Sequence, residues 1–371
     1  MSLSRRKMLA LIGGGTVLAA GAAGTGFALT RTPARALAPW AEAGGYDDPR
    51  LNALSFAILA PNPHNRQPWE AELVADDRVR IFRDPALNLP HTDPYDRQMT
   101  IGMGCFAEQM AIAATATGHF ADLAFFPDGD RPGAPVAEAV FVPGAAQPDP
   151  LGAALLDRRS CKEPYTDQQV GAPAIASLEA FARLITGPGE VAAIRDLTWA
   201  AHMVEVMTPR TYGESVDLMR FGRREIDASP DGIDLGGPFL ESLMLVGALT
   251  RDGQRDPDSA EFRQGIEIYR RMLHATPAYA VVTTQGNSRQ DQIDAGRRYL
   301  RLNLATTTLG LALHPVSQAL QEYPEMADHY ATAHRLLAGP GETVQMLGRL
   351  GYGPAVSQTP RWPLDAKLRR T

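Results

Sequence analysis

A proline-rich segment at residues 60–69 places the tightest constraint on the fold. It reads A-P-N-P-H-N-R-Q-P-W and follows residues 51–59, whose apolar positions recur at helical spacing. A helix cannot continue through Pro61, Pro63 and Pro68, because proline lacks the backbone N–H and restricts the residue before it. The sequence therefore predicts a rigid loop that holds polar side chains in one geometry at low entropic cost. These side chains are Asn62, His64, Asn65, Arg66 and Gln67.

The side chains of this loop admit two interpretations. Adjacent amide and cationic donors suit a flat ligand rich in heteroatoms better than they suit a metal ion. The alternative is a surface loop whose only buried group is Trp69. Composition alone does not separate a binding loop from a structural one.

Composition excludes several classes of function. The chain has 371 residues, of which 44% are hydrophobic and 21% charged, as in globular proteins of two or three domains or of two halves that share one core. The net charge of −6, with no basic run outside the N-terminus, argues against a nucleic-acid partner. Cys105 and Cys161 are the only cysteines, so no disulfide framework or cysteine-based metal site is expected, although one disulfide between them remains open.

The N-terminus reads as a targeting segment. Residues 4–9, S-R-R-K-M-L, form a twin-arginine pattern, and residues 9–29 carry no charge but are diluted by glycine and alanine. We expect residues 1–38 to be a signal for the twin-arginine translocation machinery, with export to the periplasm or the outer face of the cytoplasmic membrane. The A-R-A triplet at residues 34–36 could be cleaved; the alternative is an uncleaved anchor, which would be the only contact with a membrane.

The pattern of apolar residues predicts an α+β chain. Strands are expected at residues 72–82, 120–126, 136–142 and 278–284. Helices are expected at residues 51–59, 99–118, 151–158, 174–185, 191–208, 212–226, 239–249, 262–273 and 291–313. We expect a linker at residues 39–48, an exposed loop at residues 251–258, and a boundary at residues 143–150 between two halves, 39–150 and 151–371.

Two predicted helices resemble each other. Residues 104–118 and 296–310 are bounded by glycines, and Gly104 and Gly118 of the first align with Gly296 and Gly310 of the second. Helices rich in alanine can coincide in this way by chance, but the match suggests two copies of one α+β unit.

Two motifs resemble those of the nitroreductase family. The order A-P-x-x-x-N-x-Q-P-W at residues 60–69 resembles its flavin loop, with Asn62 where the family usually has serine. The R-R-S-x-K segment at residues 158–162 resembles the part that holds the flavin phosphate and ribityl chain. The resemblance implies FMN as cofactor and a nitroreductase-like α+β fold of two tandem halves around mixed or antiparallel sheets. It also implies a monomeric pseudo-dimer with one flavin site between the halves.

The same resemblance assigns the remaining site. Residues 310–318, G-L-A-L-H-P-V-S-Q, would approach the flavin N5, with Ser317 and Gln318 where the family often has Glu-Gly. The cofactor-binding residues so implied are Pro61, Asn62, Pro63, Asn65, Gln67, Arg158, Arg159, Ser160, Lys162, Pro315, Val316, Ser317, Gln318 and Arg361. Lys162 is expected near the pyrimidine edge of the ring, and no metal site is expected.

The implied chemistry is carried by the flavin N5, so no protein residue is expected to be catalytic. The leading hypothesis is an FMN-dependent oxidoreductase that reduces a quinone, a nitro compound or a similar small molecule with NAD(P)H or another donor. Export weakens the expectation of NAD(P)H, which is scarce outside the cytosol. The alternatives are a flavin-binding or flavin-sequestering protein without turnover, and a fold relative that has lost flavin.

Overall fold

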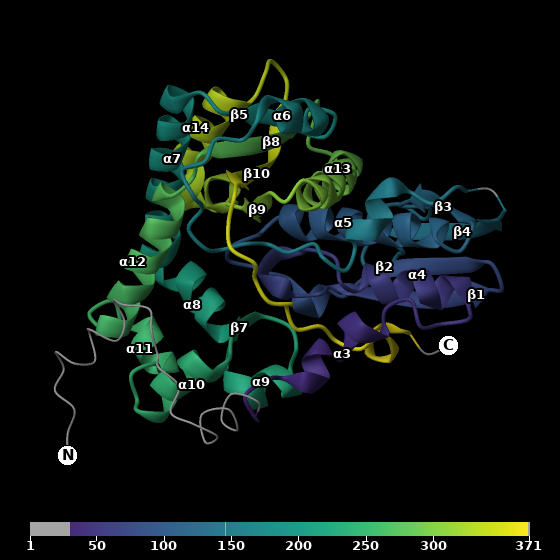
Figure 1. The fold of residues 1–371 in the computed structure, drawn as a ribbon, viewed down its shortest axis with the longest axis horizontal. Helices are drawn as coiled ribbons and strands as arrows, with labels where there is room; N and C mark the ends of the chain where they lie inside the picture. The colour runs from purple at the N-terminus through teal and green to yellow at the C-terminus, as the bar shows by residue number, and fades with distance from the viewer. Residues whose placement is uncertain (1–29, 145, 370–371) are drawn as a thin grey trace.

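Two four-stranded antiparallel sheets lie on either side of a central pair of helices (Figure 1). The computed structural model describes residues 30–144 and 146–369, so the predicted twin-arginine pattern lies outside the described residues. The expected α+β class is confirmed. None of the helices within the described ranges is both long enough and apolar enough to cross a bilayer.

The first sheet has the strand order β1-β2-β4-β3. Its strands are β1 (Trp69–Ala75), β2 (Arg78–Arg83), β3 (His119–Phe125) and β4 (Ala137–Pro143), and its helices are α4 (Pro49–Ala57) and α5 (Arg97–Thr115). The prediction of one strand at residues 72–82 is wrong, because this segment is part of a hairpin. Asp76 and Asp77, residues that favour turns, separate β1 from β2.

The second sheet repeats this connectivity with the order β5-β8-β10-β9. Its strands are β5 (Arg183–Ile185), β8 (Ala278–Thr284), β9 (Ala312–Pro315) and β10 (Thr343–Gly351). Helix α13 (Arg289–Thr308) joins β8 to β9, just as α5 joins β2 to β3. In each sheet the chain runs from an edge strand to its neighbour, through a long helix to the other edge, and back to the inner position beside that edge.

Further elements surround this arrangement. A short parallel pair is formed by β6 (Met219–Phe221) and β7 (Ile233–Leu235). The other helices are α3 (Ala34–Glu42), α6 (Ala172–Leu178), α7 (Pro188–Met207), α8 (Pro209–Asp217), α9 (Gly222–Ala228), α10 (Pro238–Leu245), α11 (Arg251–Arg255), α12 (Ala260–His274) and α14 (Ala327–Leu337). The 3₁₀ turns are η1 (Pro63–Asn65), η2 (Pro85–Leu87), η3 (Pro150–Ala154), η4 (Gln318–Leu320), η5 (Pro324–Met326) and η6 (Leu364–Lys367).

Several predicted elements differ from the structure. The helix expected at residues 212–226 is broken into α8, β6 and α9. Gly222, the first residue of α9, has φ +74°, a left-handed conformation that does not continue a helix from the residues before it. The helix expected at 174–185 stops at Leu178 and gives way to β5, and the one expected at 151–158 is only the turn η3. Helix α3 spans the last five residues of the expected signal and the first four of the expected linker, and the expected loop at 251–258 contains α11.

The central helices cross at two glycines. A Cβ atom on Gly104 of α5 would lie 2.3 Å from the carbonyl oxygen of Ile293, and one on Gly296 of α13 would lie 2.0 Å from that of Ile101. Each carbonyl belongs to the residue three positions before the opposite glycine, so the contact is reciprocal. The Sγ of Cys105 also donates to the carbonyl of Gly296 at 3.1 Å. No residue with a side chain fits at either position without moving a helix.

A group of ion pairs also stabilises the interface between α5 and α13. Glu108 of α5 is 2% exposed, and its carboxylate bonds with Arg301 and lies 2.6 Å from the Nε of Arg297, both on α13. Arg301 also reaches Asp149 at 2.9 Å. A buried carboxylate is costly without a cation, so this group favours one register of the two helices.

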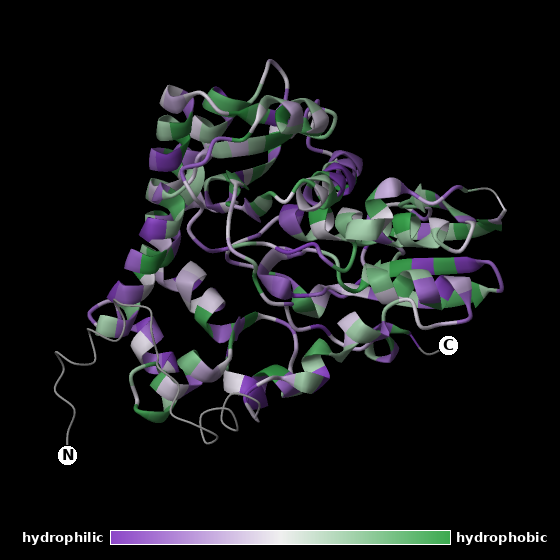
Figure 2. Cartoon of the chain, in the orientation of Figure 1, coloured by the Kyte–Doolittle hydropathy of each residue, from purple (hydrophilic) through white to green (hydrophobic). Residues whose placement is uncertain are grey.

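In Figure 2 much of α5 is coloured as hydrophobic, in keeping with its burial along nearly its whole length.

The disulfide left open by the sequence is not formed. Cys105 and Cys161 are both buried and both free. Burial raises the pKa of the Cys105 thiol to about 12, so it packs as a neutral group in the helix crossing.

The C-terminal segment returns from the second sheet to the first. Leu368 forms a parallel bridge with Ala71 of β1, and the N–H of Arg369 donates to the carbonyl of Ala71 at 2.8 Å. The Nζ of Lys367 donates to the carbonyl of Gln67 at 2.7 Å. Figure 1 shows this yellow segment passing beside α3 and ending near β1. The two sheets are therefore linked by this C-terminal segment as well as by packed helices.

The glycine crossing gives a direct test. The substitution Gly104→Ala should destabilise the protein by about 2–3 kcal/mol, because the new Cβ has no room against the backbone of α13. Gly265→Ala in α12 is the matched control, since a Cβ there meets nothing within 4 Å and alanine favours the helix by up to about 1 kcal/mol. Urea unfolding of the two variants measures the difference. Equal stability of the two variants would show that the crossing is not as tight as described.

Candidate functional site

The loop that follows α4 is held in an unusual backbone conformation. His64, Asn65 and Gln67 have φ values of 47°, 52° and 50°, in the left-handed region that non-glycine residues rarely adopt. The Oδ1 of Asn62 accepts from the N–H of Gln67 at 2.7 Å and closes the loop on itself. Such a conformation persists only when its surroundings enforce it, which makes the loop a preorganised element.

The amide side chains of the loop are used to build it. The Nδ2 of Asn65 donates to the carbonyls of Pro230 and Pro360, both at 3.1 Å. Gln67 is fully buried; its Nε2 donates to Pro230 at 2.8 Å and its Oε1 accepts from the N–H of Trp362 at 2.9 Å. The side chains of Asn65 and Gln67 were expected to bind the cofactor. Their amides instead form hydrogen bonds with protein groups and are not free to bind a ligand. The partly exposed prolines at 61 and 63 and the loop backbone remain for that role.

Two buried arginines converge on the same carbonyl. The Nη2 atoms of Arg158 and Arg361 donate to the oxygen of Leu59 at 2.9 and 3.0 Å. Arg158 also reaches Asn303 of α13 at 3.1 Å, and Arg361 reaches the Oδ1 of Asn65 at 2.6 Å. Burial, followed by repulsion from other charges, lowers the pKa of Arg158 to about 10 and that of Arg361 to about 9. Both remain cations at neutral pH, although burial makes their charged forms less favourable than in water.

A tryptophan from α3 contacts Arg361 of this pair and a third arginine, Arg159. The Cζ of Arg159 lies 4.4 Å from the ring centroid of Trp40, and the Cζ of Arg361 lies 5.8 Å from it. The Nε1 of Trp40 donates to the carbonyl of Thr359 at 2.8 Å, which fixes the ring. Cation–π contacts of this kind stabilise guanidinium groups in apolar surroundings. Sequence analysis missed Trp40, because its segment was expected to be a signal and linker.

The three arginines have no carboxylate in direct contact among the described residues, although Asp157 and Asp234 lie within electrostatic range of Arg159 and Arg361. Within the described residues, Arg158, Arg159 and Arg361 form no ion pair with a carboxylate, and the Nε of each is buried without a hydrogen-bond acceptor. We call these residues the arginine cluster. Several cations with open donors in a low-dielectric environment favour an anion with several acceptor oxygens. A phosphate monoester has that chemistry, so the residues present fit a phosphorylated ligand.

The predicted lysine lies between the loop and the end of β9. Lys162 is exposed, and its charge contributes to lowering the pKa of both His64 and His314. Burial, Lys162 and Arg66 bring the pKa of His64 to about 4, so its ring is neutral at pH 7. The Nδ1 of His64 is buried without a partner, while Ser160 beside the arginines is partly exposed.

Few backbone N–H groups at the end of β9 and just after it are free to bind a ligand. The N–H of Val316 is committed to the carbonyl of Leu347 at 2.8 Å, and Val316 is fully buried. Pro315 has no N–H. Ser317 is therefore the residue of 315–317 whose N–H has no acceptor in the described part of the chain.

A buried polar group lies behind this segment. The Nε2 of Gln318 donates to the hydroxyl of Tyr269 at 3.0 Å, and the Tyr269 ring stacks on His202 with centroids 3.7 Å apart. Burial lowers the pKa of His202 to about 3 and raises that of Glu205, which accepts from Gln321 at 3.3 Å. These residues come from α7, α12 and η4 and form no motif, so only the fold could reveal them.

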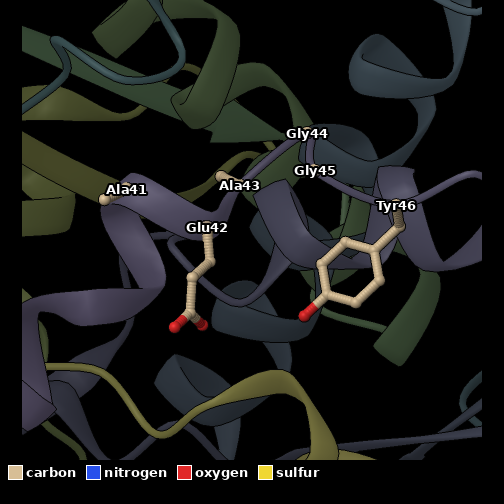
Figure 3. Close-up of a pocket in the computed structure, with 6 residues that line it drawn as sticks. All are labelled: Ala41, Glu42, Ala43, Gly44, Gly45 and Tyr46. Atoms are coloured by element: carbon tan, nitrogen blue, oxygen red, sulfur yellow. The ribbon is translucent and has the colours of Figure 1, made fainter.

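A shallow hollow lies next to Trp40 in the sequence. It has a volume of about 410 Å³ and is lined by residues 41–46. Figure 3 shows the side chains of Glu42 and Tyr46 extending toward the same side of this hollow. It contains none of the predicted site residues, and no group of three His, Cys, Asp or Glu side chains within residues 30–144 and 146–369 could hold a metal ion.

The structure thus brings together part of the predicted site. The arginine cluster assembles from residues 158–159 and 361 around the carbonyls that precede the loop. Lys162 lies within electrostatic range of the loop and of β9. The amides of the loop face protein groups, and Gln318 faces Tyr269.

Comparisons with known proteins show similarity along most of the chain. No protein-family model matches it. A Mycobacterium tuberculosis protein with the provisional name NAD(P)H nitroreductase is 25% identical over 340 residues, which cover 85% of this chain and 92% of the relative. An uncharacterized protein of the same organism is 25% identical over 348 residues, covering 86% and 92%. The crystal structure of the FMN-dependent nitroreductase NfnB from Mycobacterium smegmatis in complex with NADPH has 18% identity and a TM-score of 0.38, covering 60% of this chain and 98% of that one.

Proposed function

We propose that this chain binds FMN and acts as an oxidoreductase of the nitroreductase type on an electron-poor small molecule. One observation carries the proposal: three arginines that form no ion pair within the described residues, and whose Nε atoms are unpartnered, lie beside a strained loop of flavin-loop sequence. The similarity to relatives with the provisional name NAD(P)H nitroreductase supports it.

The arginine cluster would hold the phosphate. Its three Nε–H groups are the open donors, and Ser160 adds a hydroxyl at the same turn. The ring of Trp40 contacts two of the guanidinium groups and so limits their freedom before a ligand arrives. The backbone of the loop, with Pro61 and Pro63, would face the ring system.

The remaining residues of the site would act on the ring. Bound FMN supplies hydride transfer at N5. Lys162 would supply a positive charge to stabilise negative charge on the ring, and the N–H of Ser317, which has no acceptor among the described residues, would be the donor to N5. His64 is neutral at pH 7, so its free Nδ1 can accept a hydrogen bond without adding a charge.

We also propose that the chain is a single-chain pseudo-dimer with halves at residues 39–150 and 151–371. The repeated strand order and the reciprocal glycine contact support this arrangement. The candidate site joins the halves, because the carbonyl of Leu59 comes from the first and Arg158 and Arg361 come from the second. One chain would then hold one complete FMN site.

We make two further proposals, on the substrate of the protein and on its location. A quinone or nitro compound would be the acceptor, with NAD(P)H or another donor, in a protein exported by the twin-arginine route. The second candidate is a protein that binds or sequesters flavin without turnover. It is favoured by one observation: Val316 and Gln318 are committed to protein partners, which leaves few groups to tune the ring.

The arginine cluster predicts discrimination between FMN and riboflavin. Arg159→Gln should weaken FMN binding about 10- to 100-fold, the loss expected for one charged hydrogen bond, and should leave riboflavin binding unchanged. Arg159 is the best choice because its hydrogen bonds reach only the carbonyls of Leu156 and Arg158. Quenching of flavin fluorescence measures both affinities.

The control for this experiment is Arg335→Gln, which removes an exposed arginine of α14. It should leave both affinities at the level of the unmodified protein. Equal weakening of FMN and riboflavin in Arg159→Gln would show that Arg159 supports the fold and does not bind phosphate.

Absorbance spectra separate the two candidate functions. The FMN-loaded protein should bleach within seconds when NADH or NADPH is added without oxygen and should recover its colour with a quinone. A spectrum that bleaches only with dithionite would favour sequestration or a different electron donor. Failure to take up FMN at all would contradict both candidates.

A further inference from the structure

The described part of the chain exposes an apolar surface on α10. Phe239, Leu245 and Val246 are 54%, 69% and 66% exposed; Phe239 lies near the start of the helix, Leu245 ends it and Val246 follows it. Figure 2 shows hydrophobic colouring on α10 and on the loop that follows it, at the lower margin of the molecule. Clustered apolar side chains of this size on a surface usually mark a site of contact.

A cationic hollow adjoins this surface. It has a volume of about 660 Å³ and includes Leu245 with four arginines in its lining. The arginines are Arg31, Arg35, Arg223 and Arg224, and the only carboxylates of the lining are Asp227 and Glu241. Glu241 pairs with Arg31 at 3.0 Å and Asp227 with Arg223 at 3.3 Å. Both carboxylates are thus engaged, so the hollow carries a surplus of positive charge.

The chain emerges from its uncharged N-terminal stretch at this hollow. Thr30 belongs to the lining, and the carbonyl of Thr30 accepts from the Nη1 of Arg223 at 2.8 Å. Residues 9–29, which directly precede it in the sequence, contain no charged residue. Their glycines and alanines make them weak as the sole attachment to a bilayer, for which a single signal is seldom enough.

The fold protects the one candidate cleavage site. The A-R-A triplet lies inside α3, where Ala36 is fully buried. The N–H of Ala36 donates to Asp227 at 3.1 Å, and its carbonyl accepts from the N–H of Arg361 at 2.8 Å. A peptidase needs an extended, accessible backbone, which the folded protein does not offer here.

We propose that the chain keeps its N-terminal segment and rests on an anionic lipid surface through a docking face made of Phe239, Leu245, Val246, Arg35 and Arg224. Neither of these two arginines has an ion pair within the described residues. Their charge attracts anionic headgroups, and the three apolar side chains enter the interface beside them. Residues 9–29 supply the second attachment. This inference does not rest on FMN binding, so it stands or falls separately from the proposed function.

A fluorescent label at the docking face tests the contact. Leu245→Cys carries an environment-sensitive nitrobenzoxadiazole label in the full chain, whose native cysteines are buried. Vesicles contain phosphatidylcholine alone or phosphatidylcholine with phosphatidylglycerol at about 3:1. Emission at position 245 should rise and shift to the blue only with the anionic vesicles. Phe120→Cys is the matched control, since Phe120 is 50% exposed on β3, outside the docking face, and should not respond.

Two variants test the role of charge. Arg35→Gln with Arg224→Gln, made in the labelled chain, should remove the response to anionic lipid, whereas Arg335→Gln should leave it intact. No response at position 245, or an equal response at position 120, would overturn the docking face. An equal response to both kinds of vesicle would overturn its preference for anionic lipid.

Mass spectrometry of the chain recovered from membranes tests retention of the N-terminus. The account expects a mass that includes the residues before Ala36. A mass that begins at Leu37 would overturn retention, because it places cleavage after the A-R-A triplet.

Discussion

The close crossing of α5 and α13 is the constraint on which the rest of the structure depends. Gly104 and Gly296 let each helix touch the backbone of the other, and Glu108 with two arginines fixes their register. The crossing also positions the candidate site. Pro63 packs on Gly102 of α5, two residues before Gly104, and the side chain of Asn303 of α13 accepts a hydrogen bond from Arg158. The distance between the loop and the arginine cluster is therefore set by the helices.

Burying the charges of the arginine cluster costs free energy, which hydrogen bonds to backbone carbonyls partly offset. Burial lowers the pKa of Arg158 and Arg361, which means that their charged forms are less favourable there than in water. The oxygen of Leu59 and the ring of Trp40 offset part of that cost. Hydrogen bonds to carbonyls do not neutralise the charge, so an anion bound at the unpartnered Nε atoms would relieve the remainder. The proposed phosphate site follows from this imbalance.

Sequence reasoning was most successful where periodicity is strong. The helices at 99–118 and 291–313 and the strand at 278–284 correspond to α5, α13 and β8, although α13 ends at Thr308 and the last two residues of the second predicted helix belong to β9. It missed β10, because a strand buried on both faces shows no alternation. The motif at residues 158–162 pointed to the arginines, but no local pattern could show that Asn65 and Gln67 turn toward residues 230 and 360–362. Trp40 and the group around Tyr269 depend on contacts between segments far apart in the chain, which the sequence does not display.

The stoichiometry of FMN binding tests the central claim most directly, because the proposed arrangement assembles a single site from both halves of one chain. Titration of FMN into the flavin-free protein, followed by flavin fluorescence and paired with the molecular mass in solution, measures it. The account predicts saturation at one FMN per chain of 371 residues. Saturation at one FMN per two chains, at two per chain, or no saturable binding would contradict it.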